Sequence, residues 1–173
     1  MSKVYIGLGS NKGDRINYLN LAISELDQNE RISIVDISSF YETRPYGVMD
    51  QPNYINGVIL VETDFTPQEL YKSVKKIEGI VGRTISRHWG PREIDLDIIL
   101  YDSIVYADEM IEIPHKEYSK RDFVLVPLLE ISPDLADPVS KEKAKGLLNK
   151  LEETFIIQKL GNNIKEKLGA EIV

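Results

Sequence analysis

The sequence contains no cysteine among its 173 residues. This absence excludes disulfide bonds, thiolate metal sites and cysteine nucleophiles. Long apolar runs are missing as well: runs such as residues 58–61 are far shorter than the roughly 20 residues that a transmembrane helix requires. With only two histidines, neither a histidine-cluster metal site nor a serine–histidine–acid triad can be argued.

A surplus of basic residues is also lacking. The chain has 21 lysines and arginines against 28 acidic residues, which gives a formal net charge of -7 and a pI of about 5.0. A net acidic chain repels nucleic-acid phosphate unless its basic residues are clustered, so general nucleic-acid binding is disfavoured. No signal-peptide core follows Met1, so we expect a cytoplasmic protein.

What the sequence does have is an ordinary globular composition, with 42% hydrophobic residues. Hydrophobic residues are spread along the chain, which disfavours disorder and allows one sizeable core. We therefore expect a single domain over residues 1–160. The remaining residues, 161–173, are expected to form a tail that is either a loose helix or disordered.

Hydrophobic spacing predicts an alternation of strands and helices. Thr66, Pro67 and Glu69 are typical of a capped helix start, and Gly79 is expected to end that helix. The predicted elements are a strand at 4–8, a helix at 16–26, strands at 31–43 and 54–61, a helix from 67 and a strand at 94–101. This β-α-β-β-α-β order predicts a ferredoxin-like α+β fold, an antiparallel sheet with helices packed on it.

Beyond residue 101 the pattern is weaker. It predicts a loop at 114–123, a short helix or turn at 124–130, a helix at 141–151 and an edge strand at 155–157.

Two carboxylates stand out within the last core strand. Asp95 and Asp97 share one face of a strand, whereas Ile94, Leu96 and Ile98 share the other. A divalent cation would relieve the repulsion between the carboxylates, and Mg²⁺ prefers carboxylate oxygens together with substrate phosphates. The alternative is an exposed strand face with two solvated acids.

The segment just before this strand favours the metal interpretation. Residues 79–92 contain Arg83, Arg87, His88 and Arg92 and no acidic residue. Arginine forks bind phosphate oxygens, so a basic segment leading into a carboxylate pair suits a Mg²⁺-bound polyphosphate. A solvated basic loop is the alternative. Strand alternation alone would place Arg92 opposite the aspartates, but a turn at residues 90–91 leaves its direction open.

Aromatic and amide side chains gather between residues 41 and 56. Tyr41, Thr43, Tyr46, Tyr54 and Asn56 surround Pro45 and Gly47, a set that suits a flat heterocycle with stacking on its faces and hydrogen bonds at its edge. An ordinary hairpin connection is the alternative.

The only tryptophan, Trp89, either covers a ligand or pins its loop to the domain. His115 and Arg121 lie in a polar stretch with Phe123 and are candidates for a phosphate or a ring. Residues 7–14 fit neither a Walker loop nor a dinucleotide fingerprint, so they are interpreted as a strand-to-helix turn.

Four ordered motifs together resemble one known family. They are GLGSN at residues 7–11; SFYET at 39–43 through DQPNYIN at 50–56; HWGPREIDLDIIL at 88–100; and IPH at 113–115 through Arg121, Phe123, Pro127 and Leu128. This combination resembles the hydroxymethyl-dihydropterin pyrophosphokinase family, and the match runs from about residue 4 to about residue 138. The fold of that family is α+β and ferredoxin-like.

The resemblance implies transfer of the β,γ-pyrophosphate of ATP to 6-hydroxymethyl-7,8-dihydropterin, with release of AMP, in folate biosynthesis. It implies two Mg²⁺ ions held by Asp95 and Asp97, and catalytic roles for these residues and for Arg83, Arg87 and Arg92. The implied pterin-binding residues are Thr43, Pro45, Gly47, Tyr54, Asn56, Trp89 and Phe123. The implied ATP-binding residues are Gln51, Glu78, Arg83, Arg87, Trp89, Arg92, Ile98, His115 and Arg121.

Neither a membrane nor a nucleic-acid partner is implied, and we expect a monomer. No general base is assigned, with Asp97 and a metal-bound water as the candidates. The chain departs from the family pattern at Arg44, where proline is common, and at His88, where arginine is common.

Two other functions remain open at the level of sequence. A different Mg²⁺-dependent phosphotransferase or phosphohydrolase would use the same aspartates and arginines, and a simple kinase would release ADP rather than AMP. A ferredoxin-like binding module for RNA or a regulatory ligand is the other alternative. The acidic pI and the lack of the aromatic strand motif of RNA-binding sheets disfavour it.

Overall fold

A computed structural model describes residues 1–161 and 164. Its strands are β1 (Ser2–Ser10), β2 (Ile32–Ile37), β3 (Phe40–Thr43), β4 (Tyr54–Thr63), β5 (Asp95–Tyr101), β6 (Tyr106–Ala107), β7 (Glu112–Ile113) and β8 (Ile156–Leu160). Its helices are α1 (Arg15–Asp27), α2 (Pro67–Val81), α3 (Asp122–Ile131) and α4 (Ala144–Asn149), with a 3₁₀ turn at Tyr118–Lys120. The predicted tail lies outside the described residues, apart from residues 161 and 164.

The main sheet is antiparallel, with strand order β5-β1-β4-β3-β8 and with β2 also paired to β4. This arrangement confirms the predicted ferredoxin-like α+β fold, because β1 lies between β4 and β5 and the two core helices follow β1 and β4. The predicted strand at 31–43 is divided into β2 and β3. At the division, the Ser38 hydroxyl accepts a hydrogen bond from the Val58 N–H at 2.9 Å, so a side chain replaces a backbone partner.

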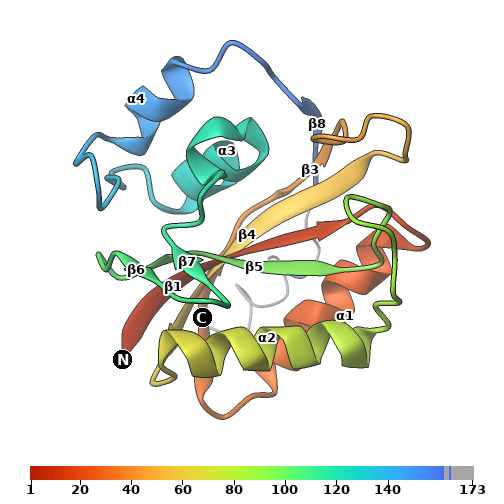
Figure 1. The fold of residues 1–173 in the computed structure, drawn as a ribbon, viewed down its shortest axis with the longest axis horizontal. Helices are drawn as coiled ribbons and strands as arrows, with labels where there is room; N and C mark the ends of the chain where they lie inside the picture. Colours follow the sequence, from red (N-terminus) through yellow and green to blue (C-terminus); the bar gives the residue numbers. More distant parts are fainter. Residues whose placement is uncertain (162–163, 165–173) are drawn as a thin grey trace.

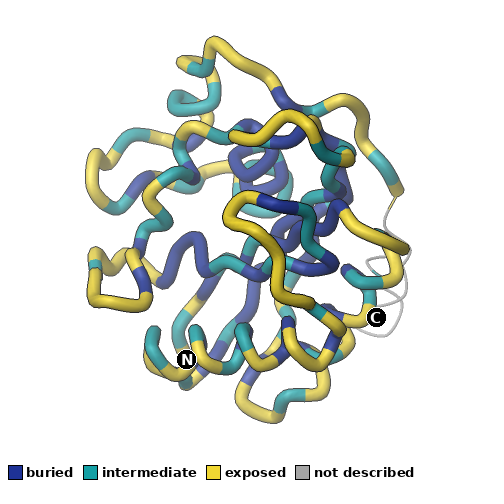
Figure 2. Tube along the Cα trace, turned by 45° about the vertical axis from the view of Figure 1, so that its right-hand side comes forward, coloured by how far each residue is buried: buried dark blue, intermediate teal, exposed yellow. Residues whose placement is uncertain are grey.

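Helices cover both faces of the sheet (Figure 1). On one face, α1 and α2 bury Leu19, Leu26 and Val74 in a core with Ile6 and Leu96. On the opposite face, α3 and α4 enclose a second core, whose members include Val58, Ile99, Phe123, Leu125 and Leu128. The strands in the middle of the molecule are buried and the connecting loops are exposed (Figure 2).

The start of α2 is as predicted and its end is not. Thr66 and Glu69 form a reciprocal capping box, with Pro67 at the first helical position. Gly79 was expected to end the helix, but α2 continues to Val81. Gly82 ends it with a φ of 121°, a conformation that glycine adopts without steric cost.

The remaining elements follow the sequence pattern in part. The predicted edge strand is β8, which pairs with β3, and the predicted short helix is α3. The helix expected at 141–151 is shorter, spanning only Ala144–Asn149, and the β6–β7 hairpin was not predicted. Among the described residues, no helix is long and apolar enough to span a membrane.

Candidate active site

The predicted carboxylate pair lies on β5, at one edge of the main sheet. Leu96 and Ile98 are buried in the core beneath α1 and α2, whereas Asp95 and Asp97 line a cavity above the opposite face. The prediction that the two aspartates share a face is therefore confirmed. They are not solvated acids on an open strand, because only 18% of the Asp95 side chain and 35% of the Asp97 side chain are exposed.

Two residues of α2 cover the outer edge of β5. The Glu78 Oε1 accepts hydrogen bonds from the Leu96 N–H and from the Lys75 Nζ, both at 2.9 Å. The Lys75 Nζ also donates to the Leu96 carbonyl at 3.0 Å and lies 3.9 Å from the Asp97 Oδ1. These side chains satisfy the backbone of an edge strand between the two aspartates, and they fix its position relative to α2.

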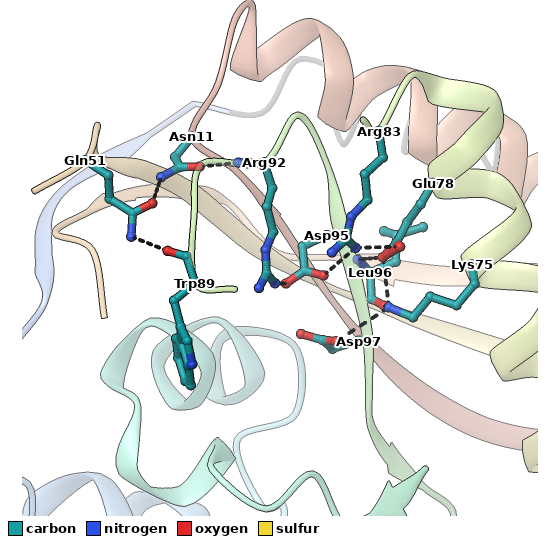
Figure 3. A network of polar contacts seen from close by, with 10 residues as sticks. All are labelled: Asn11, Gln51, Lys75, Glu78, Arg83, Trp89, Arg92, Asp95, Leu96 and Asp97. Atoms are coloured by element: carbon teal, nitrogen blue, oxygen red, sulfur yellow. Dashed lines mark hydrogen bonds and ion pairs between the residues drawn. The ribbon is translucent and has the colours of Figure 1, made fainter. Parts of the chain in front are cut away.

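Two arginines pair with Asp95. The Arg92 Nη1 lies 2.9 Å from one carboxylate oxygen, and the Arg83 Nη1 lies 3.2 Å from the other and 2.6 Å from the Glu78 Oε2. Arg92 reaches the aspartate face because it precedes the first residue of β5, so strand alternation does not constrain it. This settles the direction that the sequence left open, and Figure 3 shows the convergence of these charges.

The two aspartates differ in their electrostatic surroundings. Burial opposes the ionisation of Asp95, but the nearby cations, Arg92 first among them, lower its pKa below the usual value. Burial and, after it, the charge of Asp95 raise the pKa of Asp97 to about 7. Among the described residues, the ion pair of Asp97 is the longer contact with the Lys75 ammonium, at 3.9 Å.

A cavity of about 310 Å³ opens above the aspartates. The predicted site residues that line this cavity are Thr43, Gln51, Tyr54, Asn56, Trp89, Arg92, Asp95, Asp97, His115, Arg121 and Phe123. The predicted site residues that do not line it are Pro45, Gly47, Glu78, Arg83, Arg87 and Ile98. Thr43 and Asn56 lie on neighbouring strands, and the Asn56 amide donates to the Thr43 hydroxyl at 2.8 Å. This pair places polar groups on the floor of the cavity.

Aromatic rings form one wall of this cavity. Tyr46 packs against Phe123 at 6.1 Å and Phe155 at 5.4 Å between ring centroids, and the Arg121 guanidinium lies over the Tyr46 ring at 4.7 Å. Tyr41, which the sequence grouped with these residues, instead donates its hydroxyl to Glu130.

A second cavity, of about 610 Å³, runs along the outer edge of β5. Its lining includes Ile98, Lys75 and Met110, and it shares Asp97 and His115 with the first cavity. The two spaces therefore meet at Asp97 and His115.

His115 is placed to act as a neutral hydrogen-bond donor. Burial and, after it, the charge of Arg121 lower its pKa to about 4, so the ring is uncharged at neutral pH. The His115 Nδ1 accepts the Glu117 N–H at 3.2 Å, which leaves the ring proton on Nε2.

The loop at residues 82–94 is anchored at its base and exposed at its tip. Glu93 is buried and accepts hydrogen bonds from the Thr84 hydroxyl and the Lys12 ammonium. Burial alone would raise the pKa of Glu93, but these contacts outweigh it and lower the pKa to about 2. Arg87 and His88 are exposed, and the ion pairs found among the described residues do not include Arg87.

Trp89 lines the first cavity and fastens its loop, one of the two roles that the sequence left open, while its role in covering a ligand stays a prediction. Its ring lies against Gly47, where a β-carbon would approach the indole to 3.0 Å, and 6.5 Å from the Tyr46 centroid.

Some residues of the site were missed by the sequence analysis. Lys75 lies one turn before Glu78 on the face of α2 toward β5, a spacing visible in the sequence once that face is known. Asn11 was placed in a turn and in the GLGSN motif, but no role was assigned to it. It is 1% exposed and contacts both neighbouring loops, which no local pattern reveals. Within the described part of the chain, no group of three or more acidic or histidine side chains is arranged to hold a metal ion.

Comparison with known proteins identifies the family. The family model described as 7,8-dihydro-6-hydroxymethylpterin-pyrophosphokinase (HPPK) matches residues 5–133. The chain belongs to the HPPK family. It is 44% identical over 145 residues to the 2-amino-4-hydroxy-6-hydroxymethyldihydropteridine pyrophosphokinase of Aquifex aeolicus, covering 84% of this chain and 89% of that protein. It is 42% identical over 127 residues to the protein of the same name in Bacillus subtilis, covering 73% and 76%.

The chain also matches longer relatives and solved structures. The Schizosaccharomyces pombe folic acid synthesis protein fol1 is 42% identical over 147 residues, which are 85% of this chain and 20% of that protein. The crystal structure of Plasmodium falciparum HPPK-DHPS with pteroate has a TM-score of 0.70 at 14% identity and covers 86% of this chain. This chain spans 44% of that solved chain, and the likeness supports the fold alone.

Proposed function

We propose that this chain transfers the β,γ-pyrophosphate of ATP to the hydroxymethyl group of 6-hydroxymethyl-7,8-dihydropterin. The pterin hydroxyl oxygen forms a bond to the β-phosphorus, and the bond from that phosphorus to the oxygen bridging it to the α-phosphate breaks. The hydroxyl proton is lost, AMP leaves and the pterin carries the diphosphate. Family membership supports this reaction, and so does the arrangement of the two cavities.

The observation that carries the proposal is the meeting of two unlike cavities at Asp97, one member of the carboxylate pair. A transfer reaction needs two substrates whose reacting atoms are held close together and in line. Asp97 and His115 face both spaces, so a ligand in either one can extend its reactive group to the same point.

The cavity beneath the aromatic wall suits the pterin. Tyr54 of β4 and Phe123 of α3 line it from the sheet and from the covering helix, which supports stacking on both faces of a flat ring. The Thr43–Asn56 pair offers donors and acceptors at the ring edge. Pro45 and Gly47 act indirectly in this proposal, by shaping the loop that carries Tyr46.

The cavity along β5 suits the nucleotide. The Leu96 N–H and C=O point toward the outer edge of the strand, where Glu78 and Lys75 bind them. Because alternate residues of a strand direct their backbone groups to the same side, Ile98 offers an N–H and a C=O to the edge of a nucleobase.

Basic side chains around the junction suit the triphosphate. Arg92 and Arg121 line the first cavity, and Arg83 and Arg87 belong to the adjoining loop. Arginines match phosphate oxygens in geometry as well as in charge. His115, which is neutral at pH 7, contributes a hydrogen bond from Nε2 rather than a positive charge.

The aspartates fit a divalent metal. Their carboxylates are hard oxygen ligands on one strand face, and the described cation paired with Asp97, the Lys75 ammonium, is 3.9 Å away. We propose that Asp95 and Asp97 hold two Mg²⁺ ions, with phosphate oxygens and water completing the ligand sets. When bound, Mg²⁺ supplies charge neutralisation for the phosphoryl group in transfer.

This chain's own contribution is therefore mainly positioning. The arginines hold the phosphates, the aromatic wall excludes water, and Asp97 and a metal-bound water are the candidate proton acceptors. We further propose that residues 1–160 form the whole catalytic domain and that the chain acts as a monomer.

A nucleotide product assay tests the proposal. ATP, Mg²⁺ and the purified protein are incubated with and without 6-hydroxymethyl-7,8-dihydropterin, and the nucleotides are separated by chromatography. We expect AMP only when the pterin is present. Formation of ADP would replace the proposal with that of a simple kinase, and binding of both ligands without any turnover would favour a binding module.

A further inference from the structure

Asn11 occupies a buried junction between three loops. It follows β1, is 1% exposed, and lines neither of the two cavities. Its Oδ1 accepts the Arg92 N–H at 2.8 Å, and its backbone N–H donates to the Arg92 carbonyl at 3.0 Å. Its side-chain amide donates to the Gln51 Oε1 and to the Pro52 carbonyl, both at 3.0 Å. A single side chain thus binds the 44–53 loop and the 82–94 loop at once.

The contacts continue in both directions from Asn11, as Figure 3 shows. On one side, the Gln51 amide donates to the Val48 carbonyl at 2.8 Å and to the Trp89 carbonyl at 3.1 Å. On the other side, Arg92 pairs with Asp95 at 2.9 Å. A continuous series of hydrogen bonds therefore joins the loop over the aromatic cavity to the carboxylate pair.

The chemistry of this junction requires an asparagine. One oxygen must accept a backbone N–H while one NH₂ group donates to two oxygens, and the amide satisfies both needs. An aspartate of the same shape would keep the acceptor but would direct a second negative oxygen at the Gln51 Oε1 and the Pro52 carbonyl. A buried acceptor facing two acceptors is costly, so the 44–53 loop would separate from Arg92.

We propose that Asn11 is a positioning residue that couples the pterin site to the nucleotide site. This inference rests on the proposed function and adds a residue that touches neither substrate. When a ring binds in the aromatic cavity, it restricts the motion of the 44–53 loop. The hydrogen bonds of Gln51 and Asn11 then restrict Arg92 as well, so Arg92 binds the phosphates from a fixed position. Because coupling between two ligands is reciprocal, the nucleotide tightens pterin binding by the same factor.

The test measures this coupling directly. The affinity of a non-hydrolysable ATP analogue with Mg²⁺ is measured by calorimetry with and without the pterin, in the wild-type protein and in N11D and Q51M. Asn29→Asp is the matched control, because Asn29 undergoes the same chemical change just beyond the far end of α1. There its NH₂ group donates to the Ser73 hydroxyl at 3.5 Å and its Oδ1 accepts the Arg31 N–H at 3.0 Å, away from both cavities. The KM for each substrate and kcat for AMP formation are recorded in parallel.

In the wild-type protein we expect the pterin to tighten analogue binding about 10-fold, within the usual range for coupled sites. Asn11→Asp should reduce that factor to about 2 or less and lower kcat about 10-fold or more, with little change in analogue affinity measured alone. Gln51→Met should reduce the coupling in the same direction, and Asn29→Asp should leave it unchanged.

Two results would overturn the inference. One is a wild-type coupling factor near 1, and the other is a factor in Asn11→Asp within about twofold of the wild-type value. If Asn11→Asp does not fold, Gln51→Met decides, because Gln51 is only partly buried. Failure of the proposed function is a different outcome: the wild-type protein would then form no AMP in the presence of the pterin.

Discussion

The fixed strand β5 and the 82–94 loop meet in one site but are built differently. The aspartates of β5 stand on a strand that is paired to β1, packed on α2 and covered at its edge by Lys75 and Glu78. The tip of the 82–94 loop has no such support: Ile85 is fully exposed and Arg87 is exposed. The strand is therefore held by contacts within the protein, whereas the tip of the loop is exposed to solvent.

This difference separates two functions. Groups that must hold a metal benefit from a preformed arrangement, because positioning costs nothing at the moment of reaction. Groups that must admit substrates and then enclose them need a segment that can move. The base of the loop, held by Asn11 and Glu93, marks the boundary between the two regions.

The largest effect should come from the fixed strand. Replacing either aspartate, as Asp95→Asn or Asp97→Asn, removes a proposed metal ligand at constant shape, and we expect AMP formation to fall about 10³-fold or more. Pterin binding to the metal-free protein, measured by fluorescence, should stay within about threefold of the wild-type value. If pterin affinity fell as far as the rate, the aspartates would belong to the pterin site instead.

Shortening the loop should give the next largest effect. Deleting two residues within 83–88 misplaces the arginines, and we expect the single-turnover rate to fall about 10²-fold, the usual cost of a small misplacement of catalytic groups. Pterin affinity should change far less, because the aromatic wall is intact. Equal losses in rate and affinity would show that the loop builds the pterin cavity.

A change in the floor of the first cavity should act on binding instead. Asn56→Ala removes the amide paired with Thr43 and leaves the buried hydroxyl without that partner. We expect pterin affinity to fall by about 1–3 kcal/mol, or roughly 5- to 150-fold, with analogue affinity unchanged. Calorimetry with each ligand alone separates the two sites, and weaker binding of both ligands would instead point to a disturbed fold.

Removing the Glu78 contacts at the edge of β5 should mainly lower the stability of the fold. Glu78 is 3% exposed and its carboxylate contacts Lys75, Arg83 and the Leu96 N–H. Because Glu78→Gln leaves two nearby cations less compensated, we expect the free energy of unfolding to fall by about 2 kcal/mol in urea titrations. Glu69→Gln, at the exposed capping box, should cost less than half as much. Equal losses of unfolding free energy in the two variants would mean that the Glu78 contacts add no more stability than a helix cap.

The smallest effect concerns pH and Asp97. Its pKa is raised to about 7 in the folded, metal-free protein, so between about pH 4 and pH 7 the folded state keeps a proton that the unfolded state has lost. The free energy of unfolding should therefore fall as pH rises through this window, by about 1 kcal/mol once partial exposure is allowed for. In D97N that contribution should vanish, and an unchanged pH dependence would assign it to other groups.

The sequence predicted those parts of the site that depend on local periodicity. Asp95 and Asp97 share a face because strand side chains alternate, and Thr66 begins α2 because a capping box is a local motif. The predicted end of α2 was wrong because Gly79 is tolerated inside a helix and the helix ends at Gly82. Which of the two glycines ends the helix depends on the backbone conformation, since Gly82 has a positive φ.

Long-range contacts could not be read in the same way. Nothing near Asn11 in the sequence indicates that residues 51 and 92 meet there, or that α3 covers the opposite face of the sheet from α2. The family resemblance implied a pterin-binding role for Phe123, but gave no sign of Phe155, which precedes β8 and packs against the Phe123 ring.

The most direct test of the central claim follows the β-phosphate of ATP. The protein is incubated with Mg²⁺, the pterin and ATP labelled only at that phosphate, and the products are separated. We expect the label to leave entirely with the pterin and the nucleotide product to be unlabelled AMP. Label retained in ADP would contradict it, because only the terminal phosphate would then have moved.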